Sequence, residues 1–157
     1  MEPQQVERPA RTPVMRWLCT ASFINQGFAF LMYGILVLGA GSIRSMPLAE
    51  VQAIADSFYG RLLDPASTER MHAFLALLHE RGGLLFGIYA LRTLVRAYGT
   101  WRMWKGELIG LHIYVSAQLL GVLVPMLVFG RELFDVLGFM MVINWCYLYW
   151  SARRNLR

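Results

Sequence analysis

The sequence predicts an all-α integral membrane protein: a four-transmembrane-helix bundle with a short helical extramembrane segment between spans 1 and 2. Hydrophobic residues make up 57% of the 157-residue chain and charged residues only 16%, against about 45–50% and about 25% in soluble domains. A chain of this length forms one compact unit, whose surface is too large to cover with so few charges. The excess apolar surface therefore indicates burial in lipid.

Uncharged runs locate the spans, because about 20 apolar residues are needed to cross the ~30 Å hydrocarbon core. Residues 17–43, 108–130 and 136–152 contain no charged side chain. A weaker candidate surrounds residues 82–91, a run of ten uncharged residues. The first run also resembles a signal peptide but is too long for one. We predict a membrane domain over 17–154 between tails at 1–16 and 155–157, with spans at about 17–41, 73–97, 108–130 and 134–152.

The distribution of charge favours retaining the weak second span. With four spans and both termini in the cytoplasm, ten basic residues lie inside and five outside, in the direction of the positive-inside rule. The tryptophans give an independent argument, since indole rings favour the membrane interface. Four of the five then share the cytoplasmic interface: Trp17, Trp101, Trp104 and Trp150.

The extramembrane segment 44–70 is expected to be helical. Pro47 suits a first helical turn, and Asp64-Pro65 resembles a cap followed by a first-turn proline that opens a helix running into the second span. We expect the segment to lie on the membrane surface or at the outer end of the bundle, with a lid or docking helix as the alternative. One face of its first helix is apolar: Leu48, Val51, Ile54, Ala55, Phe58 and Leu62.

Ionisable side chains at membrane depth are candidates for a functional site, because they are costly to bury in lipid. Counting along the helix places residues 79–81 at the outer boundary, where long side chains can reach headgroups. A deeper register would make Glu80 a proton or cation site. His79 and Glu80 also match the beginning of the zinc-protease helix motif, but that motif requires a histidine at position 83, which is glycine in this chain. The candidate ionisable residues are His79, Glu80, Arg81, Arg92 and His112.

A second candidate is a layer of uncharged polar side chains near the middle of the membrane. Such side chains need hydrogen-bond partners in hydrocarbon, and contacts between helices supply them at about 0.6 kcal/mol each. We expect structural contacts between helices, and the alternative is a small-molecule or ion site. The members of the layer are Asn25, Gln26, Ser116, Gln118 and Asn144.

Two further sets have expected structural or lipid-binding roles. Small residues at Gly-xxx-Gly-like spacing allow helices to pack closely, and we expect this of Gly83 with Gly87 and of Ala117 with Gly121. A basic cluster on the cytoplasmic side suits anionic headgroups. Its members are Arg92, Arg96, Arg102 and Lys105.

The sequence predicts no catalytic residue, no metal site, no cofactor and no nucleic-acid binding. Cys19 and Cys146 are too few for a disulfide framework and are expected to be reduced thiols. Haem ligation is disfavoured, because His72 and His79 lie on the outer side and His112 near the cytoplasmic end of its span. Bis-histidine ligation needs two imidazoles facing each other at one depth.

Three short strings carry a family resemblance: Leu63-Asp64-Pro65-Ala66-Ser67, Tyr89-Ala90-Leu91-Arg92 and Tyr98-Gly99-Thr100-Trp101-Arg102. With Pro125 and Asn144, they resemble an uncharacterised family of small bacterial four-span membrane proteins, a domain of unknown function. The resemblance covers about residues 17–154 and implies the fold and a bacterial inner membrane. In that family acidic residues tend to lie where this chain has Arg96 and Met126-Leu127. The resemblance implies no activity.

These observations favour a small non-enzymatic membrane protein, an accessory or structural subunit or a lipid-associated bundle. Its expected partners are membrane lipids and either a larger membrane complex or further copies of itself. One alternative is a small-molecule or ion-binding or transport bundle that uses the polar layer and Glu80. A second is a redox protein that holds haem or quinone.

Overall fold

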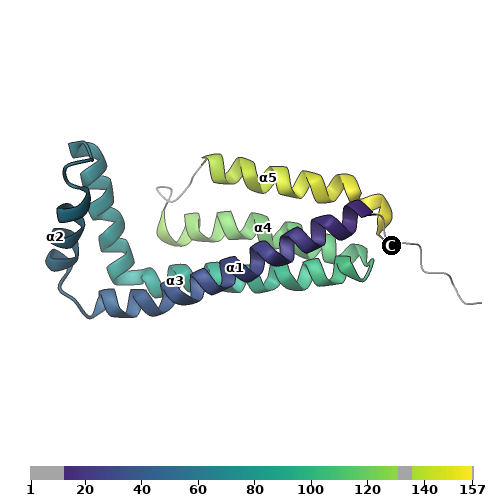
Figure 1. Ribbon diagram of the computed structural model, residues 1–157, viewed down its shortest axis with the longest axis horizontal. Helices are drawn as coiled ribbons and strands as arrows, with labels where there is room; N and C mark the ends of the chain where they lie inside the picture. The colour runs from purple at the N-terminus through teal and green to yellow at the C-terminus, as the bar shows by residue number, and fades with distance from the viewer. Residues whose placement is uncertain (1–12, 131–135, 157) are drawn as a thin grey trace, which may run out of the picture. The chain divides into compact units, whose positions relative to one another are not determined.

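The computed structural model describes residues 13–130 and 136–156, in which every regular element is a helix. The predicted all-α class is therefore confirmed. Figure 1 labels the elements in chain order: α1 (Pro13–Arg44), α2 (Leu48–Tyr59), α3 (Pro65–Trp104), α4 (Leu108–Phe129), α5 (Val136–Ser151) and the final 3-10 turn η2 (Ala152–Asn155).

Three of the described helices are long and apolar enough to cross a membrane: α1, α3 and α4, with 32, 40 and 22 residues. The helix that contains the weakest predicted span, α3, is among them. In contrast, α5 is apolar but has only 16 residues, a length of about 24 Å. The first two residues of the span predicted at 134–152 lie outside the described residues.

The chain divides into two compact units. Unit 1 comprises residues 1–26 and 94–157, and unit 2 comprises residues 27–93. The long helices α1 and α3 therefore each contribute one part to each unit.

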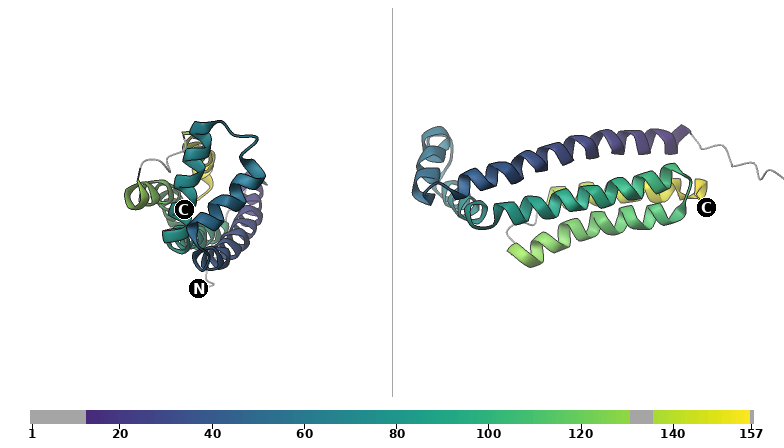
Figure 2. Two further views of the ribbon diagram at one scale, coloured as in Figure 1. Left: turned by 90° about the vertical axis from the view of Figure 1, so that its left-hand side faces the viewer. Right: turned by 90° about the horizontal axis from the view of Figure 1, so that it is seen from below.

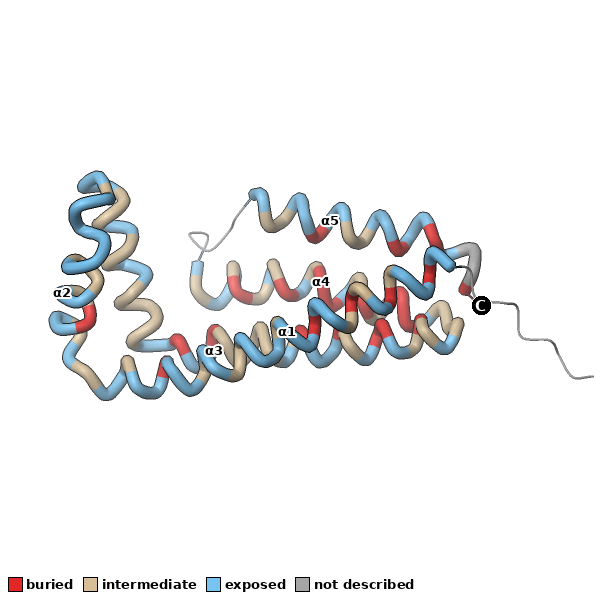
Figure 3. Tube along the Cα trace, in the orientation of Figure 1, coloured by how far each residue is buried: buried red, intermediate tan, exposed pale blue. Residues whose placement is uncertain are grey.

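Unit 1 contains the start of α1, the end of α3, and all of α4, α5 and η2. The Tyr149 hydroxyl donates a hydrogen bond to the Leu18 carbonyl at 2.7 Å, which joins α5 to α1. The Tyr149 and Tyr114 rings lie 4.6 Å apart between centroids. Figure 3 shows buried stretches alternating with exposed ones along α4, as expected of a helix that packs on one side. The core cluster is Met15, Cys19, Met103, Leu111, Tyr114, Tyr149, Ala152 and Leu156.

The end of α3 and the start of α4 pack with their backbones in close contact, and these two segments run side by side in Figure 1 and in the right-hand view of Figure 2. A Cβ atom added at Gly99 would lie 2.8 Å from the Tyr114 nitrogen, and one added at Gly110 would lie 2.5 Å from the Gly99 oxygen. Any side chain at either position would therefore force the two backbones apart.

A Schellman turn reverses the chain between these helices. The Glu107 N–H donates to the Arg102 carbonyl at 3.1 Å, and the Gly106 N–H donates to the Met103 carbonyl at 2.9 Å. Gly106 has a φ of 87°, in the left-handed region where glycine carries no Cβ penalty. An ion pair between Arg102 and Glu107 spans the same turn.

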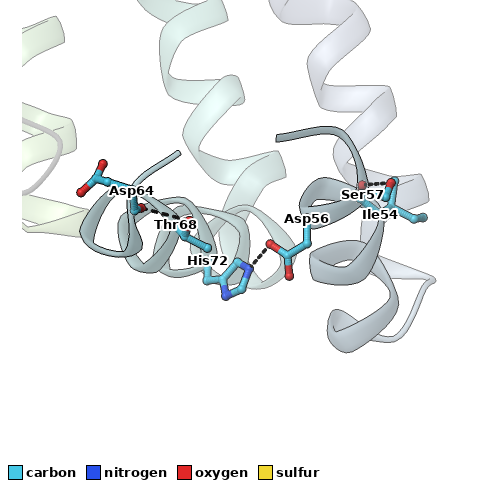
Figure 4. A network of polar contacts seen from close by, with 6 residues as sticks. All are labelled: Ile54, Asp56, Ser57, Asp64, Thr68 and His72. Carbon is cyan, nitrogen blue, oxygen red and sulfur yellow. Dashed lines mark hydrogen bonds and ion pairs between the residues drawn. The ribbon is translucent and has the colours of Figure 1, made fainter. Parts of the chain in front are cut away.

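In unit 2, α2 and the beginning of α3 form a helical hairpin. His72 on α3 points toward Asp56 on α2, and their Nε2 and Oδ1 atoms lie 2.8 Å apart (Figure 4). The His79 ring makes a second link, with Nε2 2.8 Å from the Met46 carbonyl oxygen. The predicted apolar face of the outer segment is only partly covered, since Val51 is buried whereas Phe58 is exposed.

The predicted start of the second long helix is confirmed, because α3 begins at Pro65 directly after Asp64. The Ser67 hydroxyl forms a hydrogen bond that lowers the pKa of the Asp64 carboxyl below its usual value. Backbone N–H groups of the first turn act in the same direction, as expected of a side chain that caps a helix. Figure 1 also shows α3 bending in its first half, which contains the adjacent glycines Gly82 and Gly83, a common cause of kinks.

The crossing of α3 and α4 makes a clear stability prediction. Replacing Gly110 with alanine should lower the stability of the purified protein by about 1–3 kcal/mol or more, because its Cβ would overlap the α3 backbone. The midpoint of thermal aggregation in mild detergent measures this loss.

Gly83→Ala is the matched control. It adds the same methyl group to a helix at a position with nothing within 4 Å, so its melting midpoint should equal or exceed that of the wild type. Equal losses for the two variants would show that the α3–α4 contact does not limit stability.

Candidate functional site

A chain of polar contacts runs through the interior of unit 1, beginning on α1. The Gln26 side chain, only 2% exposed, donates from Nε2 to the Thr100 hydroxyl oxygen at 2.9 Å. The Thr100 hydroxyl in turn donates to the Arg96 backbone carbonyl at 2.9 Å. The α1 side chain is thus bonded to Thr100, whose own proton is donated to the carbonyl one turn earlier on α3.

The contacts continue from α3 to α4. Arg96 donates from Nη2 to the Tyr114 hydroxyl at 3.4 Å, and its guanidinium carbon lies 5.4 Å from the Tyr114 ring centroid. Gln118 donates from Nε2 to the same hydroxyl at 3.2 Å. We call these five residues the Arg96 network: Gln26, Arg96, Thr100, Tyr114 and Gln118.

Helical spacing and the glycine contact together produce this arrangement. Arg96 and Thr100 are four residues apart, as are Tyr114 and Gln118, so each pair lies on one face of its helix. The approach of Gly99 to the Tyr114 backbone places the two faces against each other. Arg96 lies eight residues before the end of α3, about 12 Å along the helix axis.

Among the described residues, no carboxylate forms an ion pair with the buried charge of Arg96. The side chain is 9% exposed. Within residues 13–130 and 136–156, the ion pairs are His72 with Asp56 and Arg102 with Glu107, and neither includes Arg96. A buried charge is ordinarily paired, because the desolvation penalty is several kcal/mol per ion.

Two buried polar atoms of the network have hydrogen-bonding capacity to spare. Among the described residues, neither Arg96 Nε nor Gln26 Oε1 has a hydrogen-bond partner, although both are buried. The Tyr114 hydroxyl accepts from two donors, Arg96 and Gln118. Most buried polar atoms in proteins are paired, so two unpaired atoms in one network indicate a site that can accommodate a further polar group.

The network brings together two of the five residues of the predicted polar layer. Gln26 and Gln118 are both 2% exposed and share the Arg96 network. The other three, Asn25, Ser116 and Asn144, are exposed on α1, α4 and α5.

The candidate ionisable residues occupy several environments. In unit 2, His79 contacts the Met46 carbonyl, Glu80 and Arg81 are exposed, and Arg92 is half-buried. In unit 1, His112 is exposed on α4; its ring lies edge-on to Trp150 at 6.4 Å.

The predicted headgroup cluster contains one residue unlike the others. Arg102 pairs with Glu107, and the Lys105 ammonium lies 3.5 Å from the Trp101 ring centroid, where both side chains can reach an interface. Arg96 points instead to the interior of unit 1, toward Tyr114.

The predicted packing residues differ in what surrounds them. A Cβ added at Gly83 or Gly87 would meet nothing within 4 Å. Ala117 and Gly121 are buried on α4. The close backbone approach in unit 1 is made by Gly99 and Gly110, neither of which the small-residue spacing selects.

Sequence reasoning did not single out Thr100 or Tyr114, which connect the network. The signal that could have found them is the four-residue spacing from Arg96 to Thr100 and from Tyr114 to Gln118. Each pair places a hydroxyl one turn away from a longer polar side chain on the same helix face.

Comparisons with protein-family models, with curated proteins and with solved structures find no match for this chain. Cys19 and Cys146 carry thiols and form no disulfide, and no group of three metal-ligating side chains lies in the described parts of the chain. Function is therefore inferred from the Arg96 network, whose donors and single positive charge suit the binding of an anion.

Removing the shared hydroxyl should expose the energetic role of the network. Tyr114→Phe removes the hydroxyl that accepts from Arg96 and Gln118, which should lower stability by about 1–3 kcal/mol because a buried charged donor, Arg96 Nη2, loses its acceptor. The thermal midpoint in detergent is the readout.

Tyr98→Phe is the matched control, because Tyr98 also accepts a hydrogen bond from an arginine, Arg102, at 3.4 Å, but at an exposed position. Its effect should be within about 0.5 kcal/mol. If the two variants lost equal stability, burial would not increase the contribution of the tyrosine hydroxyl to the stability of the protein.

Proposed function

We propose that the chain is a four-span protein of the bacterial inner membrane that binds an anion at the Arg96 network. The length and apolar character of α1, α3 and α4 support three of the spans. The fourth is assigned to α5, with support from the ten basic residues that four spans place inside against five outside. Both termini then lie in the cytoplasm.

The observation that carries the binding role is the uncompensated buried charge of Arg96. A buried cation is destabilising unless an opposite charge or several dipoles neutralise it. Tyr114 supplies a hydroxyl and a ring face to it. A bound anion would supply the missing charge and accept the hydrogen bonds that Arg96 Nε and the Tyr114 hydroxyl can still donate.

A purely structural role for the network explains less. Polar contacts that serve only to hold helices together lose energy for each buried atom left unpaired. A buried water could bond to these atoms, yet it would leave the guanidinium charge uncompensated. Anion binding accounts for both the charge and the spare donors, so we favour it over an accessory role without a ligand.

Reporter fusions test the four-span arrangement. A fluorescent protein joined after Arg157 should fluoresce, and alkaline phosphatase at the same point should be inactive, because α5 returns the chain to the cytoplasm. Fusions after Lys105 and after Tyr59 serve as inside and outside references. An active phosphatase after Arg157 would show that α5 does not cross.

Anion-dependent stability tests the binding role. In detergent at constant ionic strength, replacing gluconate with chloride, formate, sulfate or phosphate, or adding phosphatidylglycerol, should raise the thermal midpoint for at least one of them. Saturation at 10–100 times the dissociation constant stabilises a protein by about 1.4–2.7 kcal/mol, or about 3–10 °C at this chain length.

Arg96→Gln should abolish the effect, since the cation that binds the anion is gone. Arg16→Gln removes an exposed arginine of the same unit and should preserve it. If the wild type responds to none of the five ligands, the binding role is wrong.

A further inference from the structure

We infer that the ligand of the Arg96 network is a compact monovalent anion, in the size class of chloride or formate, and that Gln26 helps to select it. This inference rests on the anion-binding role proposed above. It adds the ligand's charge, its size and one residue that determines specificity. Each follows from a separate feature of unit 1.

The charge of the ligand follows from the charges around the network. Arg96 contributes a single positive charge. Two neighbouring basic side chains on or just after the end of α3 are engaged elsewhere, since Arg102 pairs with Glu107 and Lys105 lies over Trp101. One negative charge balances one guanidinium, whereas a dianion such as sulfate would leave a net negative charge in a medium of low dielectric constant.

The size of the ligand follows from burial. Thr100 and Tyr114 are 0% exposed, Gln26 and Gln118 are 2% exposed, and Arg96 is 9% exposed. Helices cover the network on several sides, so a ligand must fit among side chains that are already packed. A single atom or a three-atom carboxylate fits this constraint better than a phosphodiester that carries glycerol and acyl chains.

The role of Gln26 follows from the orientation of its amide. In the structure, Nε2 contacts Thr100 and the buried Oε1 has no partner among described residues. A half-turn of the amide exchanges these atoms, an alternative that hydrogen-bond networks often permit. Oε1 would then accept from the Thr100 hydroxyl, and the NH₂ group would become a further donor for the anion.

This rearrangement leaves no new unpaired group on α3. The Thr100 hydroxyl now donates to the Arg96 carbonyl, but that carbonyl also accepts the helical N–H four residues later. The hydroxyl can therefore turn to Gln26 at little cost. Arg96 Nε, the Tyr114 hydroxyl and the Gln26 amide would then form a donor set for one small anion, with a single formal charge among them.

Titration of the purified full-length protein with single salts tests this inference. Sodium chloride and sodium formate, each replacing gluconate at constant ionic strength, should raise the thermal midpoint with a half-saturating concentration at least 10-fold lower than that of sulfate, phosphate or phosphatidylglycerol. If sulfate, phosphate or phosphatidylglycerol is the tightest ligand, the inference is wrong although the anion-binding role stands.

Matched amide variants test the location. Gln26→Leu should raise the half-saturating concentration of chloride or formate at least 10-fold, whereas Asn144→Leu, which replaces an exposed amide of the same unit, should leave it unchanged. Equal effects of the two variants on the half-saturating concentration would show that Gln26 does not contribute specifically to anion binding.

A charge-supplying variant keeps the inference testable if Gln26→Leu does not fold. Gln26→Glu preserves shape and places a carboxylate beside the network, where it can serve as the counter-ion of Arg96. We expect a protein that is stable in gluconate and at least 10-fold less sensitive to chloride or formate than the wild type. Unchanged sensitivity would overturn the assignment of Gln26 to the site.

Discussion

The approach of the α3 and α4 backbones at Gly99 and Gly110 is the contact on which the rest of unit 1 depends. In lipid there is no hydrophobic force to bring helices together, so association relies on close packing and polar contacts. Two glycines allow the backbones to meet, and a Schellman turn directs the chain from one helix into the other. The Tyr114 side chain is thereby held where it meets both Arg96 and Tyr149.

The same packing brings the polar side chains of the Arg96 network together in a small volume. A hydrogen bond is stronger in a medium of low dielectric constant, and an unpaired donor there is correspondingly more costly. Arg96 experiences both effects, because its Nη2 atom is bonded to Tyr114 while its Nε atom has no hydrogen-bond partner in the described part of the chain. Unit 2 shows the contrasting case, in which His72 and Asp56 pair near solvent and contribute little because water screens them.

Patterns local to the sequence predicted the helices well. The uncharged run at 108–130 corresponds to α4 at Leu108–Phe129, and the Asp64-Pro65 pair marks the start of α3. Both depend on neighbouring residues, whose chemistry is visible in the chain itself. The Arg96 network depends on contacts between residues up to 74 positions apart. From the sequence alone, an arginine near the end of a predicted span is expected to contact lipid headgroups. Only the packing of Tyr114 against α3 shows that Arg96 points to the interior of unit 1 instead.

The brevity of α5 has a consequence for the surrounding bilayer. In the proposed four-span arrangement, α1 has about 48 Å of helix and α5 about 24 Å, against a hydrocarbon thickness of about 30 Å. A helix shorter than the core is accommodated by local thinning of the lipid or by flanking side chains that extend to the interface, such as Arg153 beside Trp150. Hydrophobic mismatch of this kind costs a fraction of a kcal/mol per Å and favours the thinner parts of a membrane. The shortest proposed span, rather than the longest, would then decide which lipids surround this protein.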